Sequence, residues 1–332
     1  MDEVHPLSDV LARADRQLAR GLPAAARVWP TGFAALDTYL SGGLRSGELT
    51  LLGGPQGLGK TTFVLQVIRN VVAAGEAALY FSFEHDPASV LERVISIEAA
   101  GELGVEALSL RRVREAMEAT DGRTGTLSDR LSNAVGGAEA VRMVEGYATR
   151  LLVHRSTGTT TSVDTIRKVA QQVAEQTGRA PLVVVDYLQK VFVPHGSELE
   201  EERVTKIVEG LKDLALAMEV PVFAVVAADK EGLVAGRRLR VHNLRGSSAL
   251  AYEADVVLLM NDKFDVVARH HLVYDVGNAE RFRNWVVVSI EKNRSGLDKI
   301  DLEFRKRFEQ GRFEADGNPV AEQLVDERVY VE

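Results

Sequence analysis

The sequence predicts an α/β fold with a mostly parallel, twisted sheet that is flanked by helices. Apolar runs typical of strands alternate with longer runs of helical periodicity along most of the chain. Residues 182–185 are apolar at every position, which is typical of a parallel strand buried on both faces. Alternating strands and helices favour right-handed crossovers and a doubly wound architecture.

Each element follows from the same patterns. Strands are predicted at residues 49–53, 77–83, 151–153, 182–186, 220–227, 255–260 and 285–291. Helices are predicted at residues 60–74, 87–100, 163–176 and 201–218. The stretch that begins at residues 300–304 is predicted to form an antiparallel edge of the sheet.

The ends of the chain are predicted to be short additions to one domain. Residues 6–20 form an amphipathic helical pattern that stops at Gly21, and residues 21–27 have the composition of a linker. The apolar stripe of this helix carries Leu7, Val10, Leu11, Ala14 and Leu18. We therefore divide the chain into an N-terminal linker helix over residues 1–27, one α/β domain over residues 28–315, and a tail over residues 316–332.

Composition limits the classes of function. The 332 residues are 45% hydrophobic with a net charge of −8 and a pI near 5.5, so any nucleic-acid contact needs a local basic segment. The chain has no cysteine, which excludes disulfides and thiolate metal sites. It shows neither a signal-peptide pattern nor an apolar run of about 18 residues. We expect a cytoplasmic protein.

A glycine-rich segment predicts a site for Mg-ATP. It follows an apolar strand, opens a helical run and fits the pattern G-x-x-x-x-G-K-[ST]; its residues are Gly54, Pro55, Gln56, Gly57, Leu58, Gly59, Lys60 and Thr61, followed by Thr62. In such a loop, backbone N–H groups and the helix N-terminus surround the phosphates. Lys60 would reach the β- and γ-phosphates and Thr61 would ligate Mg²⁺. A glycine-rich turn with a stray lysine is the alternative, and the strand-then-helix context favours the phosphate loop of a RecA-like NTPase.

Two carboxylates are expected beside this loop because each ends a predicted strand. Asp186 closes the apolar run 182–185, and in a parallel sheet the carboxyl ends of the strands face the ligand. Asp186 is therefore the candidate Mg²⁺ partner of Thr61. Glu84 ends the strand 77–83 and could polarise an attacking water. A role as N-cap of the helix near Pro87 is the alternative for Glu84.

Several separate blocks resemble the C-terminal motor domain of DnaB-family replicative helicases. They are Pro30-Thr31-Gly32-Phe33, Leu36-Asp37, Gly42-Gly43-Leu44, Ser82-Phe83-Glu84, Asp186-Tyr187-Leu188-Gln189, Leu244-Arg245-Gly246-Ser247, Ala254-Asp255 and Lys292-Asn293-Arg294. The resemblance runs from about Leu7 to about Phe313. It implies that Glu84 is the catalytic base and that Asp186 holds magnesium. It also implies that Lys292 and Arg294 reach into the ATP site of a neighbouring subunit; by spacing alone, a solvated turn fits them equally well.

The resemblance further implies an assembly and a pathway. We expect a homo-oligomeric ring, a hexamer, in which the opening helix docks on the adjacent motor domain, and a role in DNA replication. Two features depart from the family pattern. Only 27 residues precede Val28, where the family carries a domain that engages primase. Ala227 occupies the position of a glutamine that senses the γ-phosphate, which puts coupling between hydrolysis and movement in question.

A basic stretch is the candidate contact with single-stranded DNA. Its residues are Lys230, Arg237, Arg238, Arg240 and Arg245, opposed only by Asp229 and Glu231. One such loop from each subunit could line the pore of a ring and follow a phosphate backbone. No aromatic residues interleave the cations, so we expect sequence-independent binding. An ordinary solvated loop is the alternative.

Two functions therefore stand at this point. The first is a ring ATPase that hydrolyses Mg-ATP, moves on single-stranded DNA and acts as a helicase. The second is a RecA-fold ATPase without helicase activity, which acts as a nucleotide-driven switch or assembly factor for a protein partner or loader. The resemblance and the basic stretch favour the first; Ala227 and the short N-terminal segment favour the second.

Overall fold

The computed structural model describes residues 4–21, 24–100, 107–120, 122, 124–194, 199–229, 232, 234, 236–246, 248–273 and 276–327. Its centre is a ten-stranded sheet with the order β11-β10-β9-β8-β3-β7-β6-β4-β5, and β12 pairs with β10. The strands β8, β3, β7, β6, β4 and β5 run parallel, whereas β9, β10, β11 and β12 are antiparallel. The predicted parallel sheet with an antiparallel C-terminal edge is confirmed.

The strands lie close to the predicted ranges. They are β3 (Leu49–Gly54), β4 (Ala78–Ser82), β5 (Leu151–Arg155), β6 (Leu182–Asp186), β7 (Val222–Ala227), β8 (Val256–Asp262), β9 (Trp285–Asn293), β10 (Ile300–Arg307), β11 (Arg312–Phe313) and β12 (Asn318–Pro319). A separate two-stranded sheet pairs β1 (Val28–Trp29) with β2 (Leu44–Arg45).

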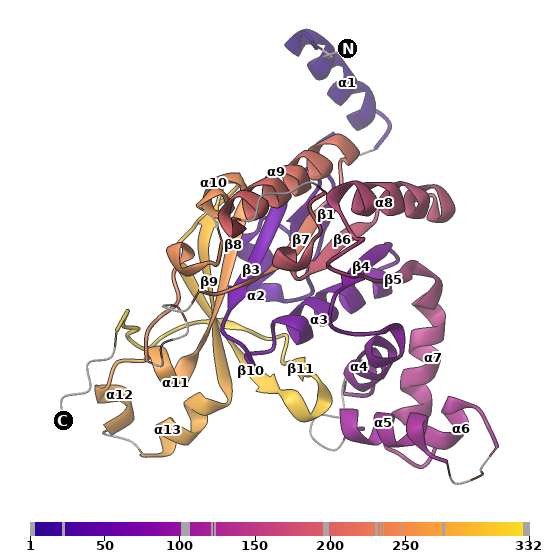
Figure 1. The fold of residues 1–332 in the computed structure, drawn as a ribbon, viewed down its shortest axis with the longest axis vertical. Helices are drawn as coiled ribbons and strands as arrows, with labels where there is room; N and C mark the ends of the chain where they lie inside the picture. The colour runs from indigo at the N-terminus through magenta and orange to yellow at the C-terminus, as the bar shows by residue number, and fades with distance from the viewer. Residues whose placement is uncertain are drawn as a thin grey trace.

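Helices cover both faces of the sheet (Figure 1). One face packs against α3 (Lys60–Ala73), α4 (Pro87–Ala99) and α7 (Gly137–Tyr147), and the other against α8 (Val163–Thr177), α9 (Glu200–Met218) and α10 (Ala249–Glu253). Neighbouring residues of a strand serve opposite faces: Leu51 belongs to the α9 side and Leu52 to the α3 side, and neither is exposed. The apolar runs thus mark strands buried on both faces, as predicted.

Local sequence explains where these helices begin and end. Asp86 caps α4 by accepting a hydrogen bond from the Ser89 backbone N–H, with Pro87 in the first turn. Ser162 caps α8 in the same way, and Gly178 ends α8 in a left-handed conformation. Three acidic residues in the first turn of α9 suit the positive end of the helix dipole.

Several short helices lie where the sequence analysis assigned no structure. They are α2 (Ala34–Tyr39), α5 (Leu110–Glu118), α6 (Leu127–Leu131), α11 (Lys263–Val266), α12 (His270–Val273) and α13 (Val276–Arg283). Five of them span only four to eight residues, too few to show a clear helical period in the sequence, whereas α5 spans nine and places Leu110, Val113 and Met117 at helical spacing. Helices α5, α6 and α7 form the lower right of the molecule in Figure 1, and α11, α12 and α13 the lower left.

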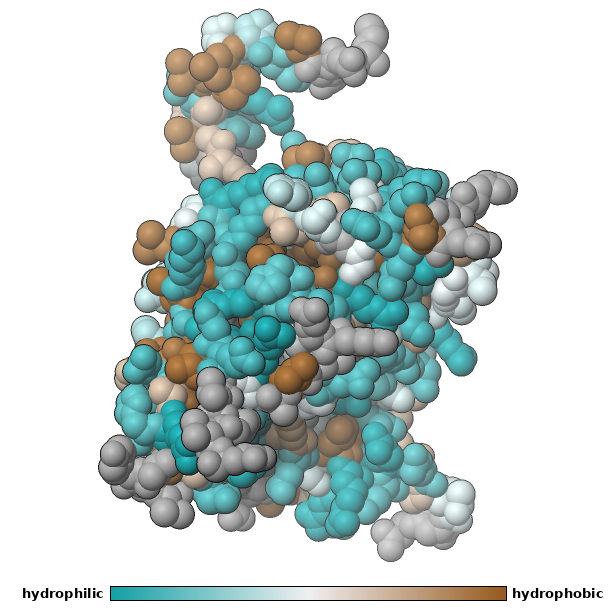
Figure 2. Space-filling view, turned by 60° about the vertical axis from the view of Figure 1, so that its left-hand side comes forward, coloured by the Kyte–Doolittle hydropathy of each residue, from teal (hydrophilic) through white to brown (hydrophobic). Residues whose placement is uncertain are grey.

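The N-terminal helix α1 (Leu7–Leu18) projects away from the body (Figure 1). None of its residues is buried, and Leu7, Leu11 and Leu18 are 81%, 63% and 62% exposed. In Figure 2 the apolar side chains on this projecting segment stand clear of the rest of the surface. Within the described residues, no helix is both long enough and apolar enough to cross a membrane.

Candidate functional site

The carboxyl ends of β3, β4, β6 and β7 open into one cavity of about 850 Å³. Its walls include Gly54, Gln56, Gly57, Gly59, Lys60, Thr61, Thr62, Glu84, His85, Arg93, Asp186, Gln189, Ala227, Arg245 and Phe308. The volume lies in the range of small-molecule sites, roughly 300–1,000 Å³. Segments far apart in the sequence thus meet at the carboxyl ends of the parallel strands, as the sequence analysis expected for the loop, Glu84 and Asp186.

The loop between β3 and α3 needs glycine at two positions. Gly57 and Gly59 have φ angles of 79° and 87°, which side chains with a Cβ rarely adopt. A Cβ on Gly59 would also lie 2.8 Å from the ring of Phe308. Gly57 has nothing within 4 Å of the same position, so its backbone is open on that side. The first residue of α3 is Lys60, which places the helix N-terminus at the cavity.

The Lys60 side chain folds over this loop. Its Nζ donates to the carbonyl oxygens of Gly54 at 2.7 Å and Pro55 at 2.8 Å. Burial lowers the pKa of Lys60, while the charges of Asp186 and Glu84 act in the opposite direction. The ammonium is therefore a partly desolvated cation whose interaction with an anion in the cavity would be stronger than in water.

Asp186 is the buried acid of the site. Its Oδ2 accepts hydrogen bonds from Thr61 Oγ1 and from Tyr80 Oη, both at 2.8 Å. Asp186 is 2% exposed and Tyr80 is 0% exposed. Burial raises the pKa of Asp186, and the two hydrogen bonds oppose that effect. Tyr80 lies on β4 next to the strand that carries Asp186, a contact that the sequence alone did not indicate.

The donor set at this point fits Mg²⁺. Thr61 and Asp186 bring a hydroxyl and a carboxylate oxygen together, and Mg²⁺ prefers hard oxygen ligands. Across the described part of the chain, no three His, Cys, Asp or Glu side chains gather into a metal cage. A magnesium ion that travels with nucleotide needs only one or two protein ligands, because phosphates and waters supply the others.

Glu84 is exposed at the cavity wall, immediately after β4. The helix cap of α4 is Asp86, so the alternative role of Glu84 as an N-cap is wrong. The next residue, His85, is held by a hydrogen bond from its backbone N–H to Ser82 Oγ at 2.9 Å. Burial and the nearby Arg93 charge lower the pKa of His85, which favours the neutral imidazole. Glu84 therefore does not cap the helix and lies exposed on the cavity wall.

Two further residues at the cavity were given no role of their own in the sequence analysis. Arg93 reaches the wall from α4, and its Nε is buried without a hydrogen-bond partner among the described residues. Gln189 bridges two segments: its Oε1 accepts from the Ala227 backbone N–H at 3.1 Å, and its Nε2 donates to the Arg245 carbonyl at 2.9 Å. Gln189 therefore fixes the end of β7, where the family pattern places the sensor glutamine and this chain has Ala227.

Lys292 and Arg294 lie at the opposite ends of the parallel strands, on the side where β3 begins. Thr50, near the start of β3, pairs with Val256, and Val256 pairs with Asn293, whereas the phosphate loop follows the end of β3. The six residues of β3, at about 3.3 Å each, put roughly 20 Å between the two ends of the strand. The structure therefore separates Arg294 and Lys292 from the cavity of their own subunit.

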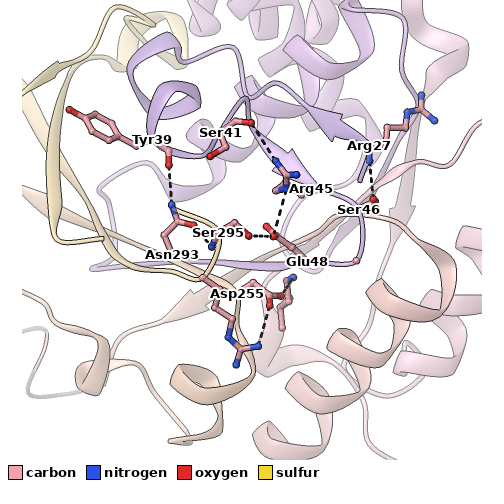
Figure 3. Close-up of polar contacts among 12 residues, drawn as sticks. Arg27, Tyr39, Ser41, Arg45, Ser46, Glu48, Asp255, Asn293 and Ser295 are labelled. Atoms are coloured by element: carbon pink, nitrogen blue, oxygen red, sulfur yellow. Dashed lines mark hydrogen bonds and ion pairs between the residues drawn. The ribbon is translucent and has the colours of Figure 1, made fainter. Parts of the chain in front are cut away.

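Polar contacts fix the chain around Asp255, Asn293 and Ser295 at this end of the strands (Figure 3). Arg294 pairs with Asp255 Oδ1 at 3.3 Å and donates to the Tyr252 carbonyl. Lys292 Nζ donates to the carbonyls of Ala251 at 2.7 Å and Tyr252 at 3.1 Å. Burial and the charge of Arg294 lower the pKa of Lys292.

The basic stretch is less open than the sequence suggested. Arg238 is 7% exposed and pairs with Asp301, so in this fold its guanidinium faces a carboxylate and is covered from solvent. Arg240 pairs with Glu291 and Asp326, and Arg245 lies at the cavity wall with its guanidinium on Glu200. Arg237 is exposed, and Lys230 lies outside the described residues.

Comparison with known proteins gives a consistent family signal. The family model described as the DnaB-like helicase C terminal domain matches residues 29–314. The replicative DNA helicase DnaB of Haemophilus influenzae is 27% identical over 288 residues, which are 84% of this chain and 53% of that protein. The corresponding protein of Treponema pallidum is 26% identical and is matched over 54% of its length. The chain thus spans about half the length of the curated relatives it matches.

Solved structures agree on the fold. One of them, described as an ATPase domain, superposes with a TM-score of 0.72 at 19% identity, over 94% of this chain and 99% of that one. A DnaB-like replicative helicase, solved in a study of its interactions with primase, superposes with a TM-score of 0.66 at 19% identity, over 94% of this chain and 67% of that one. At this identity the likeness concerns the fold alone, and it confirms the predicted RecA-like architecture.

Proposed function

This chain belongs to the DnaB-like helicase C-terminal domain family, and we propose that it is a motor that hydrolyses Mg-ATP in a closed ring and moves along single-stranded DNA. One observation carries the proposal. The cavity holds Lys60, Thr61, Glu84 and Asp186, whereas Arg294 lies at the other end of the strands of the same sheet. Because Arg294 lies far from this cavity, it could act on a bound nucleotide only in the site of a second subunit.

The residues of the cavity divide the work of hydrolysis. The loop backbone and Lys60 would hold the phosphates, and Thr61 and Asp186 would hold Mg²⁺, which neutralises charge on the β- and γ-phosphates when it is bound. Glu84 would orient and deprotonate the attacking water. Because Asp186 and its partner Tyr80 are buried, the contact between Asp186 and a cation would be stronger than in water.

Arg294 of one subunit would complete the site of the next, with Lys292 beside it. An arginine supplied in this way is worth about 10³–10⁵ in turnover rate in other NTPases. Contacts between different faces of identical subunits close into rings when the rotation permits, and we propose a hexamer. The exposed apolar stripe of α1 would be buried against the adjacent subunit. We further propose that this motor acts in the cytoplasm and in DNA replication.

Contact with single-stranded DNA would come from the segment after β7. Arg237 is exposed there, and Arg240 and Arg245 are only partly covered by their carboxylate partners. Exposed ion pairs are weak, typically below about 1 kcal/mol, so a phosphate backbone could displace the exposed carboxylates Asp326 and Glu200. The second partner of Arg240, Glu291, is part-buried. Lys230 completes the proposed set.

The ion pairs of this segment also favour a second function. Arg238 and Arg240 are already neutralised by acidic side chains, and Ala227 offers no side-chain hydrogen bond at the end of β7. A RecA-fold switch or assembly factor that acts on a protein partner or loader needs neither free cations for DNA nor a hydrogen-bonding side chain at residue 227. Nucleotide binding would then change the contact with that partner, without movement on DNA.

One experiment separates the two functions. ATP turnover is measured with and without single-stranded DNA at several salt concentrations. The motor requires stimulation by DNA. The apparent DNA affinity obtained from this stimulation should fall with salt, with a slope of about −0.7 per phosphate contact in a log–log plot. Turnover that ignores DNA at every salt concentration would support the protein switch instead.

A further inference from the structure

Asp255 holds the arginine that we assign to the neighbouring site. This carboxylate precedes β8 and is 5% exposed. Its Oδ1 faces Arg294 Nη1 at 3.3 Å, and its backbone carbonyl accepts a hydrogen bond from the Arg294 N–H at 2.9 Å. Asp255 thus contacts both the main chain and the guanidinium of the same residue.

The carboxylate is itself anchored on two other elements. Its Oδ2 accepts from the Leu49 backbone N–H at 2.8 Å and from Lys212 Nζ at 2.7 Å. Leu49 is the first residue of β3, the strand that leads to the phosphate loop, and Lys212 lies on α9. Because every oxygen of Asp255 is used, its position is fixed by the sheet and by a helix.

The arginine retains donors for another anion. A guanidinium has five N–H groups, and Arg294 gives one to Asp255 and one to the Tyr252 carbonyl. Its side chain is 49% exposed, although its partner is buried. Three N–H groups are therefore left on a side chain that is held by two hydrogen bonds and is half exposed to solvent.

The flanking residues are fixed independently (Figure 3). Asn293 Nδ2 donates to the Tyr39 carbonyl at 3.0 Å, and Ser295 Oγ donates to Glu48 Oε1 at 2.6 Å. The turn thus has anchors that do not involve Asp255. This separation lets the orientation of the guanidinium be tested apart from the fold of the turn.

We propose that Asp255 is a positioning residue for the arginine that completes the neighbouring ATP site. The inference rests on the proposed function, because it requires Arg294 to act on a second subunit. Without Asp255, the guanidinium would keep its charge and sample many orientations. A misplacement of about 1 Å can cost about 10²-fold in rate.

The test is a double-mutant cycle on ATP turnover and ATP binding in the full chain. We expect Asp255→Asn to lower kcat about 10- to 100-fold with ATP affinity unchanged. In an Arg294→Ala background, the same Asp255→Asn change should alter kcat by less than about twofold. The control Glu48→Gln removes the carboxylate beside Ser295 and should keep near wild-type turnover.

Each result assigns the failure to one idea. Normal turnover of Arg294→Ala alone would overturn the shared site. If Arg294→Ala is inactive but Asp255→Asn is normal, or lowers kcat equally in both backgrounds, the positioning role is wrong. Should Asp255→Asn misfold because Lys212 loses its partner, the variant Asp255→Asn with Lys212→Met removes the unpaired cation. That variant must show the same loss of turnover and the same non-additivity with Arg294→Ala.

Discussion

Replacement of Tyr80 by Phe should weaken magnesium-dependent ATP binding. The variant removes a single hydroxyl whose 2.8 Å hydrogen bond ends on Asp186 Oδ2. Both side chains are buried, so water is not available to replace the lost donor. Hydrogen bonds to charged groups contribute about 1.5–3 kcal/mol. Because this bond exists before ligand binds, only part of that energy enters the affinity, and the loss of affinity has an upper limit of about 10- to 150-fold.

The assay is titration calorimetry with ATP in the presence of Mg²⁺ and again with chelator. Only the magnesium-dependent part of the affinity should fall, because Tyr80 acts through Asp186. Tyr147→Phe is the matched control. Tyr147 lies on α7, away from the cavity, and its hydroxyl donates to buried Glu98 at 2.6 Å. We expect both variants to lose stability in urea and only Tyr80→Phe to lose magnesium-dependent affinity. Equal ATP binding by the two variants would refute the assignment of Asp186.

Three further outcomes are expected. Lys60→Ala should abolish ATP turnover, and unchanged turnover would remove the phosphate-loop assignment. Arg93→Ala should weaken ATP binding about tenfold without loss of stability in urea, because its Nε, which has no partner among the described residues, would then serve a phosphate rather than a protein group; a large loss of stability with normal ATP affinity would show a structural role instead. Glu322→Gln should lower stability at neutral pH, because the hydrogen bond and charge of buried Lys263 outweigh burial and hold the pKa of Glu322 below its usual value. The ionised side chain therefore stabilises the fold above its unfolded-state pKa, and this contribution is lost as the pH falls through the folded-state pKa. Urea melts at neutral and acidic pH should show the difference between the two proteins shrinking with acidification, and a constant difference would contradict this account.

The strands and the phosphate loop could be predicted because their signals are local. An apolar run such as 182–185 reports burial on both faces, and the glycine pattern before Lys60 reports a backbone that only glycine can adopt. The edge at which Asp186 and Glu84 meet then follows from the direction of parallel strands. Topology supplies the rest of the site's outline.

What could not be predicted depends on contacts between distant segments. The sequence shows Arg238 in a basic run, whereas in the fold it meets Asp301, 63 residues later. Tyr80 becomes a partner of Asp186 only because β4 and β6 are neighbours. Nothing local to Arg93 reports that its helix turns it toward the cavity. Such side chains acquire their roles from packing, which residue patterns do not encode.

The central claim is a nucleotide held by one subunit and completed by an arginine from the next. Mixing Lys60→Ala with Arg294→Ala tests it most directly, because each variant lacks what the other provides. Each alone should be nearly inactive, while random equal mixing should restore about one quarter of the wild-type sites in a closed ring, half of the sites being intact and half of their neighbours supplying the arginine. A mixture that stays as inactive as its components would contradict the shared site.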